Sequence, residues 1–360
     1  MSYINKCCQD AQWLCPQSVN LTCSKYFRSV AVSAILYFIF IIGIILAVCG
    51  NLALIISISH FKQLHTPTNI LILSMAVADF FIGIISMPVL MMKTMQVCWY
   101  SNYFVCLFDA FSSTTVSSCS EIHLLFLAVD RFYSIYYPLL YSVKITFSVV
   151  WIFVIISWIG PFIYEVLLFY LLLQVPKYCQ NNCMVVLIML IVAVDWFLTF
   201  VLPFSVMICL YGKIFTVAKR HIKTTPCAEL QGDSAKQTTA KTSWKRQNKA
   251  TKTIGIVISV FVICWTPNYL CNIMISFIHI PTIAINAVIL LGLFNSAFNP
   301  LIYGFFYPWF WKAFKVIISS RSVLLSMRFC FFICCCRFQS IVRTIVWLFP
   351  ICSLRLWTGF

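Results

Sequence analysis

The chain has 360 residues, of which 62% are apolar and only 9% are charged. Soluble domains are about 45–50% apolar and about a quarter charged, so this composition excludes both an ordinary soluble enzyme and intrinsic disorder. The formal net charge of +16 comes from 25 Lys and Arg against nine Asp and Glu. The basic residues lie between apolar runs of membrane-spanning length, which favours a membrane protein over a nucleic-acid-binding one.

Seven apolar runs are long enough to cross a bilayer. Crossing the hydrocarbon core takes about 20 helical residues, and backbone groups without water must form helices. The runs are 30–58, 68–92, 103–130, 146–172, 184–212, 253–276 and 282–305. The expected fold is therefore an all-α membrane protein with a seven-transmembrane helix bundle. Residues 1–29 contain no cleavable signal peptide, so the first run itself is expected to direct insertion.

The basic residues and the cysteines predict the orientation. Five of the 25 basic residues lie on the side of the amino terminus: Lys6, Lys25, Arg28, Lys93 and Lys177. Cytoplasmic loops hold the Lys and Arg excess, so the amino terminus is expected outside the plasma membrane. Eight cysteines share that face, where disulfides persist: Cys7, Cys8, Cys15, Cys23, Cys98, Cys106, Cys179 and Cys183. Asn20 begins a glycosylation acceptor on the same side.

The longest connection, residues 219–252, is polar and basic. It is expected to be a solvated, flexible inner loop, either with no further role or as part of a partner's binding surface. The five histidines are scattered without ligand partners, and no nucleotide-binding or paired metal-ligand motif occurs. A transporter would show repeated halves or interrupted helices, which are not found. The chain is therefore predicted to be neither an enzyme nor a transporter.

Six of the nine carboxylates lie in or beside the apolar runs: Asp79, Asp109, Glu121, Asp130, Glu165 and Asp195. An ionisable group at bilayer depth costs roughly 2.5–3.5 kcal/mol on insertion scales, so each needs a partner, a watery cavity or a proton. Six such groups in one small bundle indicate a polar cavity and a function that uses it.

Each of the seven runs carries a distinctive residue or motif. In order they are Gly50-Asn51, Asp79, Cys106 with Asp130-Arg131-Phe132, Trp158, Pro203 with Tyr211, Phe261-Cys264-Trp265-Pro267, and Asn299-Pro300-Leu301-Ile302-Tyr303. At these spacings they resemble the rhodopsin family of G-protein-coupled receptors over residues 30–318. The resemblance implies a receptor domain at 30–305, a short amphipathic eighth helix at 306–318 and a heterotrimeric G protein as partner.

Two further stretches narrow the resemblance. Residues 295–303 with Tyr307-Pro308-Trp309-Phe310, and the first inner loop at 60–69, are similar to trace amine-associated receptors. These receptors are mostly olfactory amine sensors. The resemblance therefore implies a small amine ligand, a stimulatory G protein and cyclic AMP output.

The usual amine-binding residues of such receptors are replaced in this chain. Ser113 stands where an Asp holds the ligand ammonium, and Leu293 replaces the Tyr that supports it. A subset of these receptors carries an Asp eight residues before the fifth-helix Pro, and Asp195 matches that position. About eleven helical residues, some 16 Å, separate it from the outer loop. Three aromatic residues are expected to supply cation–π faces and hydrophobic walls of the ligand pocket: Trp196, Trp265 and Tyr269.

Several alternatives remain for the acids. Asp195 is either the ligand's carboxylate or a structural hydrogen bonder. Asp109 lies on the same helical face as Ser113. It is either a second cation site for a diamine or a charged residue at the outer rim of the ligand pocket. Glu165 is a weaker ligand candidate, and Glu121 is assigned a structural or gating role. The alternative function is a rhodopsin-family receptor for a ligand that is not an amine.

Four residues match the family's positions for a sodium ion in the middle of the bundle: Asp79, Ser120, Asn295 and Asn299. A hard cation prefers oxygen ligands, and these side chains carry them. Such an ion would stabilise the inactive state, whereas the alternative is a protonated Asp79 that only forms hydrogen bonds. No other cofactor is expected.

The activation switch is implied by the same resemblance. Asp130 beside Arg131 predicts an ion pair that restrains Arg131 until activation. Tyr211 and Tyr303 are expected to rearrange around the freed Arg131. Pro267 is expected to kink the sixth helix, and the bulky Trp265 side chain is expected to move that helix on activation. Pro300 is the proline of the seventh helix that belongs to the same switch.

The family also implies three disulfides: Cys106–Cys183, Cys15–Cys179 and Cys23–Cys98. The remaining cysteines are expected in the core: Cys49, Cys119, Cys209, Cys264 and Cys271. Residues 319–360 are unlike a receptor tail. They are either anchored by palmitoylated cysteines or an incorrectly assigned carboxyl terminus.

Overall fold

A computed structural model describes residues 29–95, 103–174, 190–191, 193–224, 234–274, 278, 280–306 and 310. These residues form helices and no strands, which confirms the predicted all-α class. The chain divides into two compact units, Met1–Pro308 and Trp309–Phe360. The predicted eighth helix and the tail at 319–360 lie outside the described residues except for Phe310.

The described helices follow the predicted runs closely. They are α2 (Val30–His60), α3 (Pro67–Phe81) with η2 (Ile82–Ser86) and α4 (Met87–Met95), α5 (Tyr103–Tyr136), α7 (Phe147–Gln174), η4 (Phe197–Val201) with α9 (Leu202–Thr224), α10 (Ser234–Met274) and α11 (Thr282–Phe306). Two short helices join them: η1 (Lys62–Leu64) and α6 (Pro138–Lys144).

Six of the described helical segments are long and apolar enough to cross a membrane: Val30–His60, Pro67–Met95, Phe147–Leu172, Ala193–Val217, Thr251–Met274 and Ile283–Phe306. The predicted third run falls in α5, which has 34 residues but is less apolar. Serines, threonines and the acids Asp109, Glu121 and Asp130 interrupt its apolar positions. A helix that other helices surround tolerates such residues, since its side chains face protein instead of lipid.

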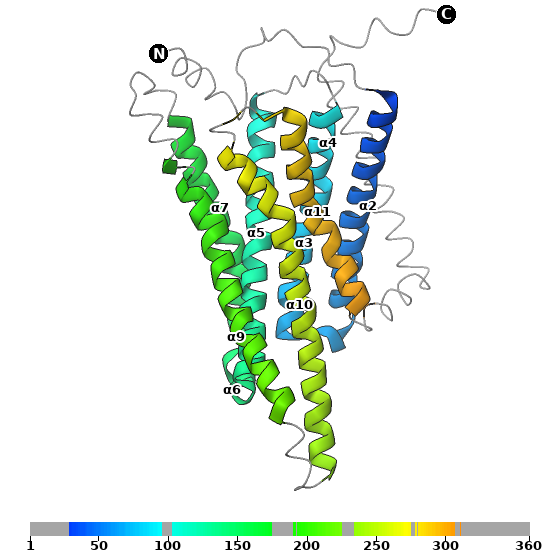
Figure 1. Ribbon diagram of the computed structural model, residues 1–360, viewed down its shortest axis with the longest axis vertical. Coiled ribbons are helices and arrows are strands. Elements are labelled where there is room, and N and C mark those ends of the chain that lie inside the picture. Colours follow the sequence, from blue (N-terminus) through cyan, green and yellow to red (C-terminus); the bar gives the residue numbers. More distant parts are fainter. Residues whose placement is uncertain are drawn as a thin grey trace, which may run out of the picture. The chain divides into compact units, whose positions relative to one another are not determined.

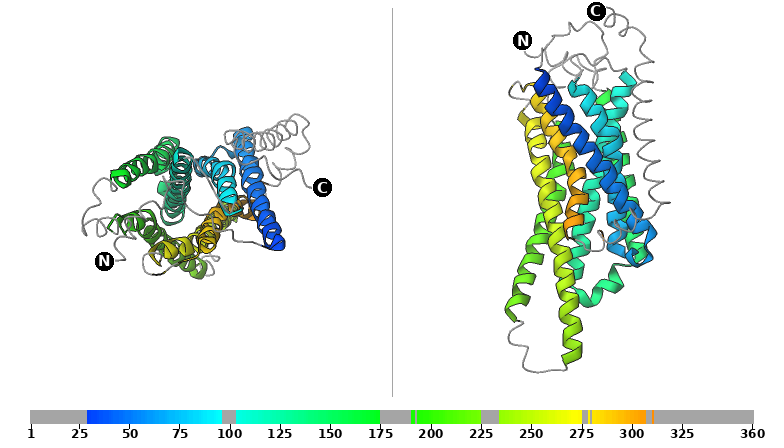
Figure 2. Two further views of the ribbon diagram at one scale, coloured as in Figure 1. Left: turned by 90° about the horizontal axis from the view of Figure 1, so that it is seen from above. Right: turned by 90° about the vertical axis from the view of Figure 1, so that its right-hand side faces the viewer.

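Helix α5 lies in the middle of the bundle (Figure 1), where it contacts α3, α7, α9 and α10. Helix α11 packs against α10 and α2, and α2 also packs against α3. Seen end-on in Figure 2, α2 and α7 lie on opposite sides of the bundle. The acids of α5 therefore face several neighbouring helices.

Proline and capping residues explain several helix boundaries and irregularities. The Thr66 side chain accepts a hydrogen bond from the Asn69 backbone N–H, and Pro67 occupies the first turn of α3. Prolines suit this position because the first N–H groups of a helix have no intrahelical acceptor. The π-helical η4 ends two residues before Pro203, which cannot donate a backbone hydrogen bond. The wide turn therefore accommodates the proline without ending the helix.

The predicted flexible loop at 219–252 is largely helical in the structure. Helix α9 continues to Thr224, and α10 begins at Ser234. The prediction of a solvated loop is therefore wrong for residues 219–224 and 234–252. Low hydropathy marks where the apolar run ends, but a polar sequence without Pro or Gly can continue as helix into water. Figure 1 shows α9 and α10 extending beyond the other helices at that end.

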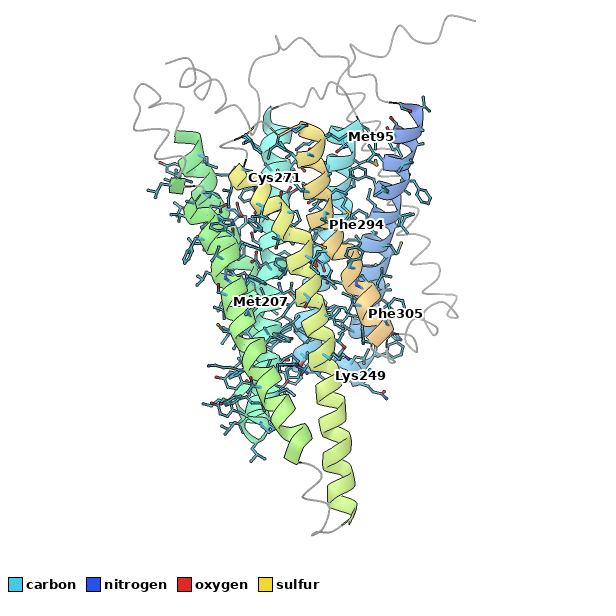
Figure 3. The ribbon with its side chains drawn as sticks, in the orientation of Figure 1. Met95, Met207, Lys249, Cys271, Phe294 and Phe305 are labelled. Carbon is cyan, nitrogen blue, oxygen red and sulfur yellow. The ribbon has the colours of Figure 1, made fainter. Side chains whose placement is uncertain are left out.

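Glycines allow α2 to approach its neighbours closely. A Cβ atom at Gly50 would lie 2.7 Å from Pro300 Cβ, and one at Gly43 would lie 2.7 Å from Phe294 Cζ. Phe294 lies midway along α11 in Figure 3, whereas Phe305 near its end projects outward with 81% exposure. Close contact between α2 and α11 therefore depends on glycine at position 50, where the neighbour is a rigid proline ring, whereas at position 43 the end of the Phe294 side chain could shift.

The expected core positions of the cysteines are correct for some and wrong for others. Cys119 and Cys264 are buried. Cys209 is exposed on α9, so its predicted core position is wrong. A cysteine on a spanning helix can face lipid at little cost, because it behaves as a small apolar side chain.

Candidate functional site

Asp195 lies in the helical residues that lead into η4, and its side chain is half-buried. The Tyr164 hydroxyl of α7 donates to Asp195 Oδ1 at 2.8 Å, and Thr199 Oγ1 donates to the Asp195 carbonyl at 2.7 Å. Among the described residues, the two salt bridges are Lys93–Asp109 and Arg131–Asp130. Asp195 therefore has no cationic partner in that part of the chain.

Aromatic side chains from η4 and α10 gather on this side of the bundle. The ring centroids of Trp265 and Tyr269 are 6.1 Å apart, and Phe200 stacks on Tyr269 at 4.2 Å. The Tyr269 hydroxyl interacts electrostatically with Glu121 and, to a smaller extent, with Asp195. The Trp196 Nε1–H is buried without a hydrogen-bond acceptor among the described residues. The arrangement offers aromatic faces and an unused donor next to a carboxylate.

Two more carboxyl groups lie near Asp195. Glu121 of α5 is 4% exposed, and its Oε1 atom has no hydrogen-bond donor among the described residues. Glu165 of α7 is 3% exposed; Ser118 Oγ lies 3.5 Å from its Oε1, and its Oε2 is likewise without a partner. Both glutamates interact electrostatically with Asp195. Helices α5 and α7 and the residues that lead into η4 thus bring together three acids that can hold protons or attract a cation.

Beside Ser113 of α5, the described charged side chains form an ion pair. Lys93 Nζ of α4 lies 2.5 Å from Asp109 Oδ2. Ser113 Oγ donates to Ser86 Oγ at 2.9 Å and also lies 3.3 Å from Asp109 Oδ1. Leu293 belongs to an apolar cluster between α2, α4 and α11. Around Ser113, the part of the chain that the structure describes therefore offers hydroxyls, the paired charges of Lys93 and Asp109, and hydrocarbon.

Asp79 is the centre of a buried polar cluster. Its Oδ1 accepts from Ser120 Oγ at 2.9 Å and from Ser296 Oγ at 2.8 Å, and its Oδ2 accepts from Asn299 Nδ2 at 2.7 Å. The Oδ1 atoms of Asn295 and Asn299 are buried without a hydrogen-bond donor among the described residues. The donor set around Asp79 fits a hard cation, because a carboxylate, two hydroxyls and the side-chain amide of Asn299 meet there.

Arg131 and Asp130 form a buried pair near the far end of α5. Arg131 Nε donates to Asp130 Oδ2 at 2.9 Å, and its Nη2 lies 2.5 Å from the same oxygen. Thr68 of α3 donates to Asp130 Oδ2 at 2.9 Å, and the Tyr141 hydroxyl of α6 donates to Oδ1 at 2.9 Å. Asp130 thus ties α3 and α6 to the Arg131 end of α5.

Burial, together with the negative charge of Asp130, raises the pKa of Tyr141 to about 12. The Tyr141 hydroxyl is therefore protonated, and able to donate, throughout the neutral range.

The other predicted switch residues lie on separate helices. A Cβ at Gly255 of α10 would lie 3.0 Å from Tyr211 Cε1, so the Tyr211 ring of α9 contacts α10. Tyr303 is fully buried in α11. Pro267 lies inside α10 and Pro300 inside α11.

The predicted disulfides Cys106–Cys183, Cys15–Cys179 and Cys23–Cys98 and the glycosylation acceptor Asn20 lie outside the residues whose side chains the structure describes.

Sequence analysis missed five residues that complete these clusters: Lys93, Tyr164, Ser296, Thr68 and Tyr141. Tyr164 precedes Glu165, and Ser296 follows Asn295, so adjacency to a predicted residue was the available signal. In the sequence alone, Lys93 is evidence only for the orientation of the chain in the membrane. Which carboxylate each donor reaches depends on helix packing.

Comparison with known proteins connects these clusters to a family. The family model for 7 transmembrane receptors (rhodopsin family) matches residues 50–303. The chain is 36% identical over 318 residues to Trace amine-associated receptor 1 of Homo sapiens, which covers 85% of this chain and 94% of that protein. It is 37% identical over 322 residues to Trace amine-associated receptor 13c of Danio rerio, covering 87% of this chain and 94% of that protein.

A third relative extends the pattern. Trace amine-associated receptor 8b of Mus musculus is 38% identical over 325 residues, or 87% of this chain and 94% of that protein. The matched region contains the Asp79 cluster and the Arg131 pair. The chain is therefore a multi-pass plasma membrane receptor and not an enzyme, and it belongs to the trace amine-associated receptors of the rhodopsin family of G-protein-coupled receptors.

Proposed function

We propose that this receptor senses small amines and that the Asp195 carboxylate binds the ligand ammonium. The observation that carries the proposal is the pairing of the acids. Asp109 has Lys93 as its counter-ion, whereas the side-chain partner of the Asp195 carboxylate among the described residues is the neutral hydroxyl of Tyr164. A carboxylate without a cation in a low-dielectric bundle attracts an ammonium strongly. The names of the relatives fit the same ligand chemistry.

The surrounding residues suit an amine. Tyr164 holds one oxygen of Asp195 and leaves the other for the ligand. Trp265 and Tyr269 present aromatic rings on the same side of the bundle, where a cation gains from the ring faces. Ser113, with its hydroxyl bonded to Ser86, serves as a neutral wall. The ligand's charge is thus assigned to helix five instead of helix three.

Signal output is part of the proposal. The amino terminus lies outside, the Arg131 end of the bundle faces the cytoplasm, and a stimulatory G protein raises cyclic AMP in an olfactory cell. The excess of Lys and Arg in the predicted inner segments supports this orientation. Release of Arg131 from Asp130 would open the G-protein surface, and the extensions of α9 and α10 would border it.

Sodium is the proposed allosteric ion. Asp79 would supply the charge, and Ser120, Asn295 and Asn299 would supply neutral oxygens. The amide oxygens of Asn295 and Asn299, which have no hydrogen-bond donor among the described residues, support the assignment, because buried acceptors ordinarily have donors. The ion would favour the inactive population, and an agonist would shift the receptor away from it.

The test is Asp195→Asn in the full-length receptor, assayed against a panel of mono- and diamines. Asparagine keeps the shape and can still accept from Tyr164, so the change removes mainly charge. Losing one partner of a buried charge pair costs about 2–5 kcal/mol, which is at least about a 30-fold loss of amine affinity. The measurements are radiolabelled amine binding and amine-evoked cyclic AMP at matched surface expression.

Asp109→Asn is the matched control, and it should change amine affinity less than about threefold because Asp109 serves Lys93. An unchanged dose–response curve in Asp195→Asn would reject Asp195 as the amine site. Amine binding without cyclic AMP would retain the ligand and reject the stimulatory coupling. No response to any amine would favour the alternative, a receptor for a different ligand class.

A further inference from the structure

Lys93 and Asp109 form an ion pair near the end of α5 that lies opposite Arg131. Lys93 is in the last turn of α4, and Asp109 is in the second turn of α5. Lys93 Nζ lies 2.5 Å from Asp109 Oδ2, and the two side chains are 29% and 11% exposed. Figure 3 labels Met95, the last residue of α4, at this end of the bundle. The proposed amine contact is at Asp195, so it assigns no function to Lys93.

The Asp109 carboxylate has a partner at each oxygen. Its Oδ2 pairs with Lys93, and its Oδ1 lies 3.3 Å from Ser113 Oγ. A carboxylate attracts a further cation strongly only while its own charge is unbalanced, because the fields of a close ion pair largely cancel at a distance. A ligand ammonium would therefore gain from Asp109 only by displacing Lys93.

Displacing Lys93 is unfavourable because the lysine belongs to the same folded chain. A tethered group competes at a high effective concentration, on the order of millimolar even for flexible links. A ligand present at lower concentration does not replace it. A second ligand ammonium that stays beside the pair instead meets the Lys93 ammonium, and like charges at close range oppose binding.

The distance between the pair and the amine site defines which ligands would meet Lys93. Ser118 Oγ of α5 lies 3.5 Å from Glu165, whose neighbour Tyr164 donates to Asp195, so Ser118 marks the level of the amine site on α5. Asp109 precedes Ser118 by nine residues, which correspond to about 14 Å of helix. An extended diamine of about ten carbons spans about 13 Å between its nitrogens, so its second ammonium would come near the pair.

We propose that Lys93 makes the receptor selective for amines that carry a single ammonium group. The inference rests on the amine function proposed above and narrows its ligand class: the ammonium binds Asp195, and the other end of the ligand is uncharged. Asp109 is then the counter-ion of Lys93 and not of the ligand. Without the Lys93 charge, the same carboxylate becomes a second cation site, and the receptor accepts long diamines.

The experiment measures equilibrium binding of two radiolabelled probes, 10-amino-1-decanol and 1,10-diaminodecane, to the full-length receptor in phosphatidylcholine nanodiscs. The probes have the same length and differ by one charge. The wild-type receptor should bind the amino alcohol at least tenfold more tightly than the diamine. Lys93→Met keeps an unbranched side chain and removes the charge. It should bind the diamine at least tenfold more tightly than the wild type does, with less than a twofold change for the amino alcohol.

Three further variants control for structural effects. Lys93→Arg keeps the cation and should retain the wild-type selectivity. Lys93→Gln can still donate a neutral hydrogen bond to Asp109, and it should show the same gain in diamine binding as Lys93→Met, even if the methionine variant does not fold. The double variant Lys93→Met/Asp109→Asn removes both charges, so it should bind the diamine as weakly as the wild type does.

The inference is overturned if the wild type binds both probes equally, or if Lys93→Met and Lys93→Gln bind the amino alcohol normally without gaining diamine affinity. A gain that persists in the double variant also overturns it, because Asp109 would then not be the second site. Failure of the amine proposal gives a different result: the wild type binds neither probe, or Asp195→Asn binds the amino alcohol as the wild type does.

Discussion

Asp130 accepts hydrogen bonds from three different elements, and this makes it the most heavily restrained carboxylate among the described residues. Arg131, Thr68 and Tyr141 all donate to it. Freeing Arg131 therefore disturbs a small network as well as one ion pair. The strength of the restraint is set by neutral donors that a mutation can remove one at a time.

Removing the Tyr141 hydroxyl is the clearest test of this network. Tyr141→Phe keeps the ring and loses the hydrogen bond to Asp130 together with a 3.3 Å contact to Thr68 Oγ1. The hydrogen bond to Asp130 is worth about 1 kcal/mol, or about a fivefold change in the ratio of restrained to released receptor. Basal, ligand-independent G-protein activation should rise accordingly at equal surface expression. Tyr136→Phe, at an exposed tyrosine on the neighbouring turn, should leave it unchanged. Equal basal activity in both variants would contradict the restraining role.

The same hydroxyl predicts a pH dependence. The pKa of Tyr141 is raised to about 12, first by burial and then by the charge of Asp130, from an ordinary value of 10.0. Its stabilising contribution is fully present below pH 10 and is lost as the pH rises toward 12. The difference in unfolding temperature between wild type and Tyr141→Phe should therefore be constant from pH 6 to pH 9. A difference that shrinks within this range would contradict the assignment.

At the scale of elements, the contact between α2 and α11 depends on a missing side chain. A methyl group at Gly50 would lie 2.7 Å from both Cβ and Cγ of Pro300, atoms that cannot rotate away. The helices would have to separate. Overpacking of this kind costs about 1–3 kcal/mol.

Gly50→Ala should therefore lower the unfolding temperature of the purified receptor and reduce its surface expression. Gly212→Ala is the control, because its Cβ would meet nothing within 4 Å. Alanine is a better helix former than glycine by about 1 kcal/mol, so this control should be neutral or slightly stabilising. A stabilised Gly50→Ala receptor would show that α2 does not approach Pro300 so closely.

Helices α9 and α10 are longer than the apolar runs from which they were predicted. Hydropathy locates the part of α10 that crosses the membrane, Thr251–Met274, but the helix begins at Ser234. Residues 234–250 contain neither Pro nor Gly, and such a segment continues a helix once the spanning part has nucleated it. The polar part was therefore mistaken for a loop.

At the scale of the whole molecule, the Asp79 cluster joins α3, α5 and α11, so an ion there would act on the entire bundle. The receptor should unfold at a higher temperature in sodium chloride than in N-methylglucamine chloride of equal concentration. At a concentration ten times the dissociation constant, the gain is about 1.4 kcal/mol. Asp79→Asn should abolish the difference, and Asp109→Asn should retain it. A sodium effect that survives in Asp79→Asn would reject the site.

The sequence by itself determined the class of fold, the positions of the membrane-spanning segments and the family. Spanning helices are local structures: each satisfies its own backbone groups, so apolar length alone predicts them. The motifs around Asp79, Asp130 and Pro300 are short stretches of sequence at the spacing typical of the family, so they can be recognised without coordinates.

Only the tertiary structure decided which charges are matched. Lys93 and Asp109 lie on different helices, as do Tyr164 and Asp195, and no periodicity along one helix shows such pairs. The same applies to Glu121, whose Oε1 atom has no hydrogen-bond donor among the described residues, and to the cavity where α5, α7 and the η4–α9 segment meet. Which side chains of two helices pair depends on how each helix is rotated about its axis and how far it is shifted along the bundle. A carboxylate's partner therefore becomes visible only after the helices have assembled.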